Sequence, residues 1–142
     1  MDVFTYGTLQ ADAIWRRVSQ QECESVAGEA HGFLARRVRS ADYPAMVEQE
    51  DGVVPGLVYV GVGPEAVRRL DAFEGAEYIR RPIAVRCADG RERRCQAYLL
   101  APSCRGRLSD DPWTLDAFLG SDAYHRFTRT YVGFPTVEQD QP

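Results

Sequence analysis

Hydrophobic residues recur at helical spacing in the middle of the chain. Val67, Leu70 and Phe73 lie three residues apart, which places their side chains on one face of a helix. A proline precedes this stripe at the position where helices begin, and Gly75 follows it where helices end. The pattern predicts a helix over residues 64–74 with one buried face.

Extended segments are predicted before this helix. Residues 3–6 are rich in β-branched and aromatic side chains and indicate a strand, residues 26–39 indicate one or two irregular strands, and residues 53–62 indicate another. The acidic residues 48–52 are expected to form a turn before the last of these strands. Gly56 inside that strand indicates a bulge or a close approach of another backbone.

A hairpin is predicted after the helix. Apolar side chains alternate with polar or small ones along residues 83–87 and again along 95–99. A three-residue loop ending at Gly90 would put both apolar sets on one face of the sheet, whereas a two-residue loop would set them beside polar residues. In the longer-loop register, Cys87 and Cys95 lie too far apart along the ladder for a disulfide.

Shorter helices are predicted near both ends of the chain. Residues 11–18 carry apolar side chains four apart. Later, Asp111 is expected to cap a helix that ends near Gly120. Residues 121–131 form a further helical candidate, because their aromatic side chains recur at spacings of three and four. Residues 137–142 are expected to be a polar, flexible tail.

These elements predict one domain over residues 1–136, of the α+β class. We expect a small mixed or antiparallel sheet, curled or closed into a barrel and flanked by helices. No regular crossover helices separate the strands, which counts against a doubly wound parallel sheet. A chain of 142 residues can bury a substantial core without disulfides or metal ions.

Composition narrows the function classes. A formal net charge of −4 argues against broad nucleic-acid binding, which needs a concentrated basic surface. All 17 basic residues are arginine, so a Schiff-base lysine and a P-loop lysine are excluded. The four cysteines have no metal-site spacing, and we expect no bound metal. The sequence shows neither a signal-peptide pattern nor an apolar stretch that could span a bilayer, so we expect a cytoplasmic protein without a membrane partner.

Glu74 is the strongest candidate for chemistry. It follows Leu70 by four residues, so its carboxylate points along the apolar stripe in the last turn of the helix. Burial and the helix C-terminus both disfavour ionisation, so we expect a raised pKa, which suits a general acid/base near neutral pH. On geometry alone, a helix end that frays into solvent is the alternative. Glu77 is the competing carboxylate, but it lies beyond Gly75 and off the helix.

The turn formed by Tyr6, Gly7, Thr8 and Leu9 joins a strand to a helix. Such a turn presents backbone N–H groups, and a glycine lets a ligand approach the main chain, so the turn could hold a carboxylate or an oxyanion. A glycine that only makes the turn is the alternative. Tyr78, together with the glutamate before it, would suit the rim of an active site, and a solvated loop is again the alternative.

Four segments of the chain form an ordered pattern, which is Phe4-Thr5-Tyr6-Gly7-Thr8-Leu9, Tyr43-Pro44-Ala45, Gly56-Leu57-Val58-Tyr59 and Leu70-Asp71-Ala72-Phe73-Glu74-Gly75, followed by Tyr78 and Arg80. Together they resemble the gamma-glutamylcyclotransferase-like superfamily, and most closely its AIG2-like and gamma-glutamylamine cyclotransferase branch. The resemblance covers about residues 2–100. It implies a small mixed β-barrel flanked by helices, with the site at one mouth.

The resemblance also implies roles and a reaction. Residues 6–9 would bind the glutamyl group of a small-molecule substrate, with Tyr78 beside them, and Glu74 would be the acid/base. The reaction would be intramolecular aminolysis of a γ-glutamyl amine or peptide, giving 5-oxoproline and a free amine without a cofactor. Two other classes stay open, which are a non-catalytic binding module for γ-glutamyl-like metabolites and a nucleic-acid-binding barrel, the latter disfavoured by the acidic charge.

Overall fold

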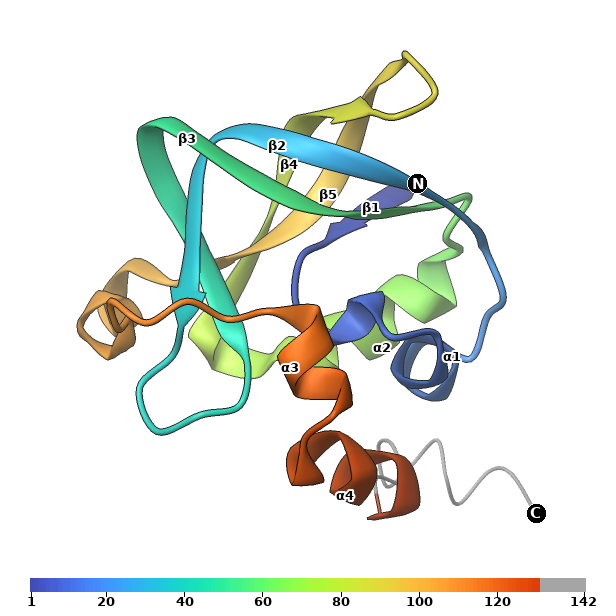
Figure 1. The fold of residues 1–142 in the computed structure, drawn as a ribbon. Coiled ribbons are helices and arrows are strands. Elements are labelled where there is room, and N and C mark those ends of the chain that lie inside the picture. Colours follow the sequence, from blue (N-terminus) through green and yellow to red (C-terminus); the bar gives the residue numbers. More distant parts are fainter. Residues whose placement is uncertain (131–142) are drawn as a thin grey trace.

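Five strands close into a barrel in the computed structural model, which describes residues 1–130 of the chain (Figure 1). The strand order is β1-β3-β2-β4-β5, with β1 and β5 parallel and the other pairs antiparallel. The sheet is therefore mixed, and the predicted α+β barrel is confirmed. Its strands are β1 (Asp2–Thr5), β2 (Glu24–Arg37), β3 (Pro44–Val60), β4 (Tyr78–Cys87) and β5 (Glu92–Leu100).

The helices gather at one end of the barrel, the lower end in Figure 1. The predicted central helix is α2, whose bounds match the expected residues 64–74, and Gly75 ends it with a positive φ of 70°. No helix in the described part of the chain is long and apolar enough to cross a membrane. The helical elements are η1 (Thr8–Gln10), α1 (Asp12–Ser19), α2 (Pro64–Glu74), η2 (Gly75–Glu77), η3 (Pro102–Arg107), α3 (Leu115–Leu119) and α4 (Asp122–Thr130).

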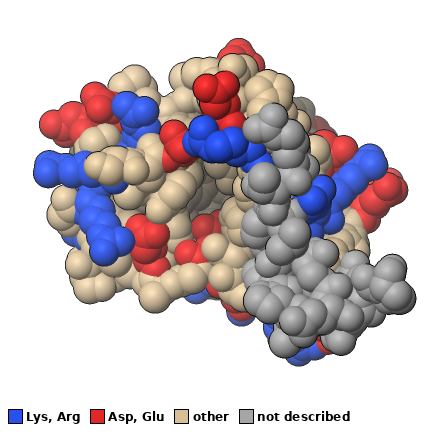
Figure 2. Space-filling view, turned by 90° about the horizontal axis from the view of Figure 1, so that it is seen from below, with Lys and Arg blue, Asp and Glu red and all other residues tan. Residues whose placement is uncertain are grey.

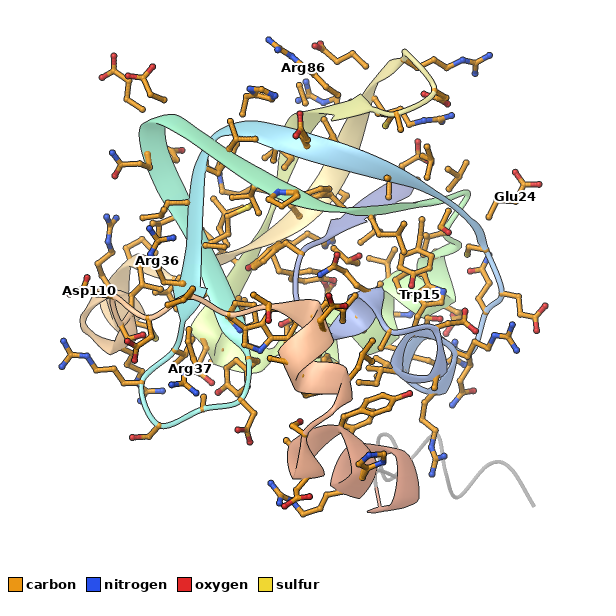
Figure 3. The ribbon with its side chains drawn as sticks, in the orientation of Figure 1. Trp15, Glu24, Arg36, Arg37, Arg86 and Asp110 are labelled. Carbon is orange, nitrogen blue, oxygen red and sulfur yellow. The ribbon has the colours of Figure 1, made fainter. Side chains whose placement is uncertain are left out.

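Apolar side chains pack both inside the barrel and beneath it. Phe4, Met46 and Val58 are almost fully buried in the barrel interior. Trp15 of α1 lies under the barrel (Figure 3). Its ring stacks on that of Tyr59 in β3, with ring centroids 3.7 Å apart. This second layer anchors α1 and α2 to the sheet and fixes the end of α2 in place.

The β4–β5 hairpin has the predicted register. Ile83 pairs with Cys95, and the turn between the strands includes Gly90, whose φ is 86°. The N–H of Cys87 donates to the carbonyl of Arg91 at 2.8 Å, which leaves a three-residue loop between them. Cys87 and Cys95 are both free thiols, as expected.

The prediction that a turn at residues 48–52 precedes a separate strand is wrong. β3 is one long strand that pairs with β2 on both sides of this segment. Phe33 pairs with Glu48 and His31 with Val53, so the acidic residues form an irregularity in the register. Local composition suggested a turn, but pairing with β2 on both sides makes this segment an irregularity within one strand, with Asp51 at a positive φ of 65°.

Gly56 marks a close backbone approach, as predicted. A Cβ atom there would lie 2.2 Å from the carbonyl oxygen of Thr5 and 2.7 Å from the ring of Phe4. Any side chain at this position would push β1 away from β3. Gly56 therefore lets β1 lie close against β3.

The start of the first C-terminal helix differs from the prediction. α3 begins at Leu115, capped by Thr114, whose hydroxyl accepts a hydrogen bond from the N–H of Ala117 at 3.3 Å. Asp111 instead pairs with Arg37 of β2, 3.6 Å away. The predicted end near residue 120 is correct. The end of the second predicted helix at residue 131, the domain end at 136 and the tail at 137–142 lie outside the described residues.

Candidate active site

A cavity of about 440 Å³ opens where the barrel end meets the helices. Figure 2 views the molecule from below and shows a hollow surface there, with acidic side chains nearby. The six residues predicted from the sequence all line this cavity, although α1, β2 and β3 lie between two groups of them along the chain. They are Tyr6, Gly7, Thr8, Leu9, Glu74 and Tyr78.

The loop of residues 6–9 is fixed by its neighbours. Thr5 donates its hydroxyl hydrogen to the carbonyl of Leu57 at 2.8 Å, which holds the end of β1. A Cβ atom on Gly7 would lie 3.0 Å from the ring of Pro44, so a side chain at this position would have to displace that ring. The N–H of Gln10 donates to the carbonyl of Gly7 at 3.1 Å and closes η1. The N–H groups ahead of it have no partner within that short helix.

Tyr6 and Tyr78 are held as neutral phenols. Tyr6 donates its hydroxyl hydrogen to the carbonyl of Tyr98 and accepts from the N–H of Met46 at 3.1 Å. Tyr78 donates to the carbonyl of Pro44 at 2.8 Å. Burial is the main cause that raises the pKa of both phenols far above the ordinary value. These hydroxyl groups brace the cavity wall and do not release protons.

Glu74 is the last residue of α2, and its side chain points into the cavity. Burial raises its pKa from an ordinary 4.5 to about 8, and the charges of Glu77 and Asp71 add to the effect. Among the described residues, no side chain or backbone group donates a hydrogen bond to its carboxylate. The expected rise in pKa is therefore present, with two neighbouring carboxylates as further causes. At pH 7 this carboxyl group is mostly protonated and can still exchange its proton.

Glu77 lines the same cavity, but both of its carboxylate oxygens accept hydrogen bonds from protein side chains. Tyr43 donates a hydrogen bond to its Oε1 at 2.9 Å, and Arg107 donates to its Oε2 at 3.2 Å. Burial, followed by the hydrogen bond to Glu77, raises the pKa of Tyr43 to about 12, so Tyr43 remains a donor at neutral pH. Of the two candidate carboxylates, Glu74 is the one left open to a ligand.

Sequence reasoning missed several residues of the cavity wall. Tyr98 of β5 donates its hydroxyl hydrogen to Asp71 at 2.6 Å and lines the barrel side. Phe118 and Phe127 come from α3 and α4 and line the opposite side. Their aromatic spacing was visible, but nothing local in the sequence placed those helices over the site. Within the described residues, no group of three His, Cys, Asp or Glu side chains could hold a metal ion.

Comparison with known proteins gives the family. Residues 3–115 match the model of the family described as "Gamma-glutamyl cyclotransferase, AIG2-like". The chain belongs to this family. AIG2-like protein A of Arabidopsis thaliana is 33% identical over 92 residues, 65% of this chain and 56% of that protein. Protein AIG2 A of the same plant is 27% identical over 93 residues, 66% of this chain and 55% of that protein. The chain thus spans little more than half the length of these relatives.

Solved structures share the fold. A solution structure of an Arabidopsis thaliana protein superposes with a TM-score of 0.69 at 24% identity, covering 99% of this chain and 93% of that one. A structure described as gamma-glutamyl cyclotransferase superposes with a TM-score of 0.60 at 18% identity, covering 70% and 66%. These neighbours confirm the gamma-glutamylcyclotransferase-like fold that the sequence suggested.

Proposed function

We propose that this protein is a gamma-glutamylcyclotransferase that cyclises the glutamyl group of a small γ-glutamyl amine or peptide. The observation that carries the proposal is the position of Glu74, a carboxyl group with a raised pKa that faces the same cavity as the Tyr6–Leu9 loop. Membership of the cyclotransferase family supports it.

The reaction is an intramolecular aminolysis. The α-nitrogen of the glutamyl group attacks its own γ-carbonyl carbon, a ring C–N bond forms, and the C–N bond to the leaving amine breaks. The products are 5-oxoproline and a free amine. Nucleophile and electrophile share one molecule, so the site must mainly hold the substrate in the folded-back shape that permits ring closure.

Glu74 would move the protons. Its ionised form takes a proton from the α-ammonium, and the neutral amine so formed attacks the carbonyl carbon. The protonated Glu74 then gives its proton to the leaving nitrogen, and the ring nitrogen loses its second proton to the departing amine, which leaves as an ammonium ion. A substrate ammonium beside Glu74 favours the ionised carboxylate and so prepares the base on binding. Backbone N–H groups of residues 7–9 would stabilise the negative charge that develops on the carbonyl oxygen. No step requires a metal ion or an organic cofactor.

A binding module for γ-glutamyl metabolites is the second candidate, because the same cavity could hold the ligand without turnover. An assay distinguishes the enzyme from the binding module. The protein is incubated with γ-glutamyl amines, γ-glutamyl peptides and glutathione, and the release of 5-oxoproline is measured. Release that depends on Glu74 supports the enzyme. Calorimetric binding without release from any compound supports the binding module.

A further inference from the structure

The two sides of the cavity come from different parts of the chain. The barrel side and the end of α2 lie within residues 3–115, which match the family model. The facing side comes from α3 and α4, of which all but Leu115 lies beyond the match. The family model therefore covers one side of the cavity and not the other.

The facing side is aromatic. Phe118 of α3 is only 7% exposed and borders the cavity. Phe127 of α4 meets Phe73 edge to face, with ring centroids 6.0 Å apart and planes at 89°. Phe73 directly precedes Glu74. Phe118 and Phe127 of the facing side, together with Phe73 at the end of α2, form an aromatic wall beside the proposed acid/base.

Contacts with one residue hold the wall over the cavity. The indole N–H of Trp113, just before α3, donates to the backbone carbonyl of Asp42 at 2.8 Å. The carboxylate of Asp42 lies 3.9 Å from the guanidinium of Arg126 in α4. Asp42 precedes Tyr43, which donates to Glu77, so the wall is tied to the barrel side of the site.

Apart from Glu74, the charged side chains that line the cavity in the described part of the chain face a partner of opposite charge. Asp42 faces Arg126, and Glu77 faces Arg107. A charged group on a bound ligand would lose its water against an aromatic surface. Because the charged side chains nearby already face partners, they would not offset this costly desolvation. An apolar group would instead gain free energy by leaving water.

The aromatic wall borders the same cavity as residues 6–9 and Glu74, the proposed partners of the glutamyl half. We propose that this wall binds the leaving amine, and that the protein prefers γ-glutamyl amides whose amine carries an uncharged aliphatic or aromatic group. The proposal rests on the cyclotransferase function proposed above. It makes Phe127 a specificity-determining residue outside the part of the chain that matches the family.

A matched series of γ-glutamyl amides tests the preference. Amides of pentylamine, diaminopentane and aminopentanoate have the same chain length and end in a methyl, an ammonium and a carboxylate group. We expect kcat/KM for 5-oxoproline release to be about tenfold or more higher for the pentylamide than for either charged amide. Equal values across the series, or a higher value for a charged amide, would overturn the proposal.

Phe127→Ala should remove this preference selectively. Its kcat/KM for the pentylamide should fall about tenfold, while the values for the charged amides change little. Leu119→Ala on α3 is the matched control, because Leu119 is 36% exposed and does not line the cavity. An equal fall for all three amides would show that Phe127 supports the site as a whole and would contradict the proposal.

Binding to Glu74→Gln, measured by calorimetry, separates the two proposals. If the pentylamide binds this variant more tightly than the charged amides but the wild type releases no 5-oxoproline, the cyclotransferase function fails and the aromatic wall stands. If the wild type releases 5-oxoproline but the variant binds all three amides equally, the function stands and the wall fails as a selective surface.

Discussion

The end of α2 and the η2 turn that follows it each carry a glutamate into the same cavity, and the two differ in their partners. Glu74 has no hydrogen-bond donor among the described residues, while Glu77 is bound by Tyr43 and Arg107. They are three residues apart in sequence. The comparison shows that two carboxyl groups close together in sequence and lining one cavity can differ in whether protein donors hold them.

Glu74→Gln gives the largest expected effect. Glutamine has the shape of the protonated glutamate but cannot accept and return a proton. We expect 5-oxoproline release to fall by about two to four orders of magnitude while γ-glutamyl ligands still bind. Steady-state kinetics and calorimetry measure the two quantities.

Glu77→Gln is the control for that prediction. Turnover in this variant should fall much less than in Glu74→Gln, because Glu77 already accepts hydrogen bonds from protein side chains. If Glu77→Gln were the inactive variant and Glu74→Gln the active one, the roles of the two carboxylates would be reversed.

The same Glu74→Gln variant should be more stable than the wild type at neutral pH. The folded protein binds the Glu74 proton more tightly than the unfolded chain, because the pKa rises from 4.5 to about 8 on folding. Between these values the unfolding free energy of the wild type therefore falls as pH rises. We expect an advantage for the variant on the order of 3 kcal/mol at pH 7, measured by urea unfolding. It should vanish below pH 4.5, and an advantage independent of pH would argue against a buried, titrating Glu74.

The pH dependence of turnover should show the effect of the Glu77 charge on the pKa of Glu74. We expect kcat/KM to increase as pH rises through about 8, because the substrate-free enzyme then ionises Glu74. The charge of Glu77 is one cause of the high pKa, after burial, so Glu77→Gln should move the profile to lower pH. A profile unchanged in this variant would show that the two groups do not interact.

Tyr43→Phe should give the smallest effect. It removes the hydrogen bond to Glu77 Oε1 and leaves Glu74 untouched. We expect a loss of about 1 kcal/mol in unfolding free energy and little change in turnover. A loss of turnover close to that of Glu74→Gln would assign the chemistry to the Tyr43–Glu77 pair.

Local signals in the sequence were sufficient to predict α2 and the hairpin of β4 and β5. Pro64, Gly75 and the apolar stripe between them predicted α2, and with it the direction of the Glu74 side chain. Gly90 predicted the register of the hairpin. Each of these features is decided by residues within one turn or one loop of each other.

Other features depend on partners distant in the sequence. Asp111 looked like a helix cap, but it faces Arg37 of β2, and Thr114 caps α3 instead. Residues 48–52 looked like a turn until β2 paired on both sides of them. The positions of Phe118 and Phe127 over the cavity depend on how α3 and α4 pack, which no short pattern encodes. The aromatic wall could therefore not be predicted from the sequence.

Closure of the barrel by its first and last strands also bears on how the protein is made. Asp2 of β1 pairs with Cys95 of β5, so a ribosome completes β1 long before it supplies the parallel partner. Pairing across such a span must first pay the entropy of a long loop, and we expect it to be slow. During synthesis, the Tyr6–Leu9 loop and Glu74 leave the ribosome before the barrel that unites them can close. The nascent chain therefore has no closed barrel beside these residues until β5 has been translated.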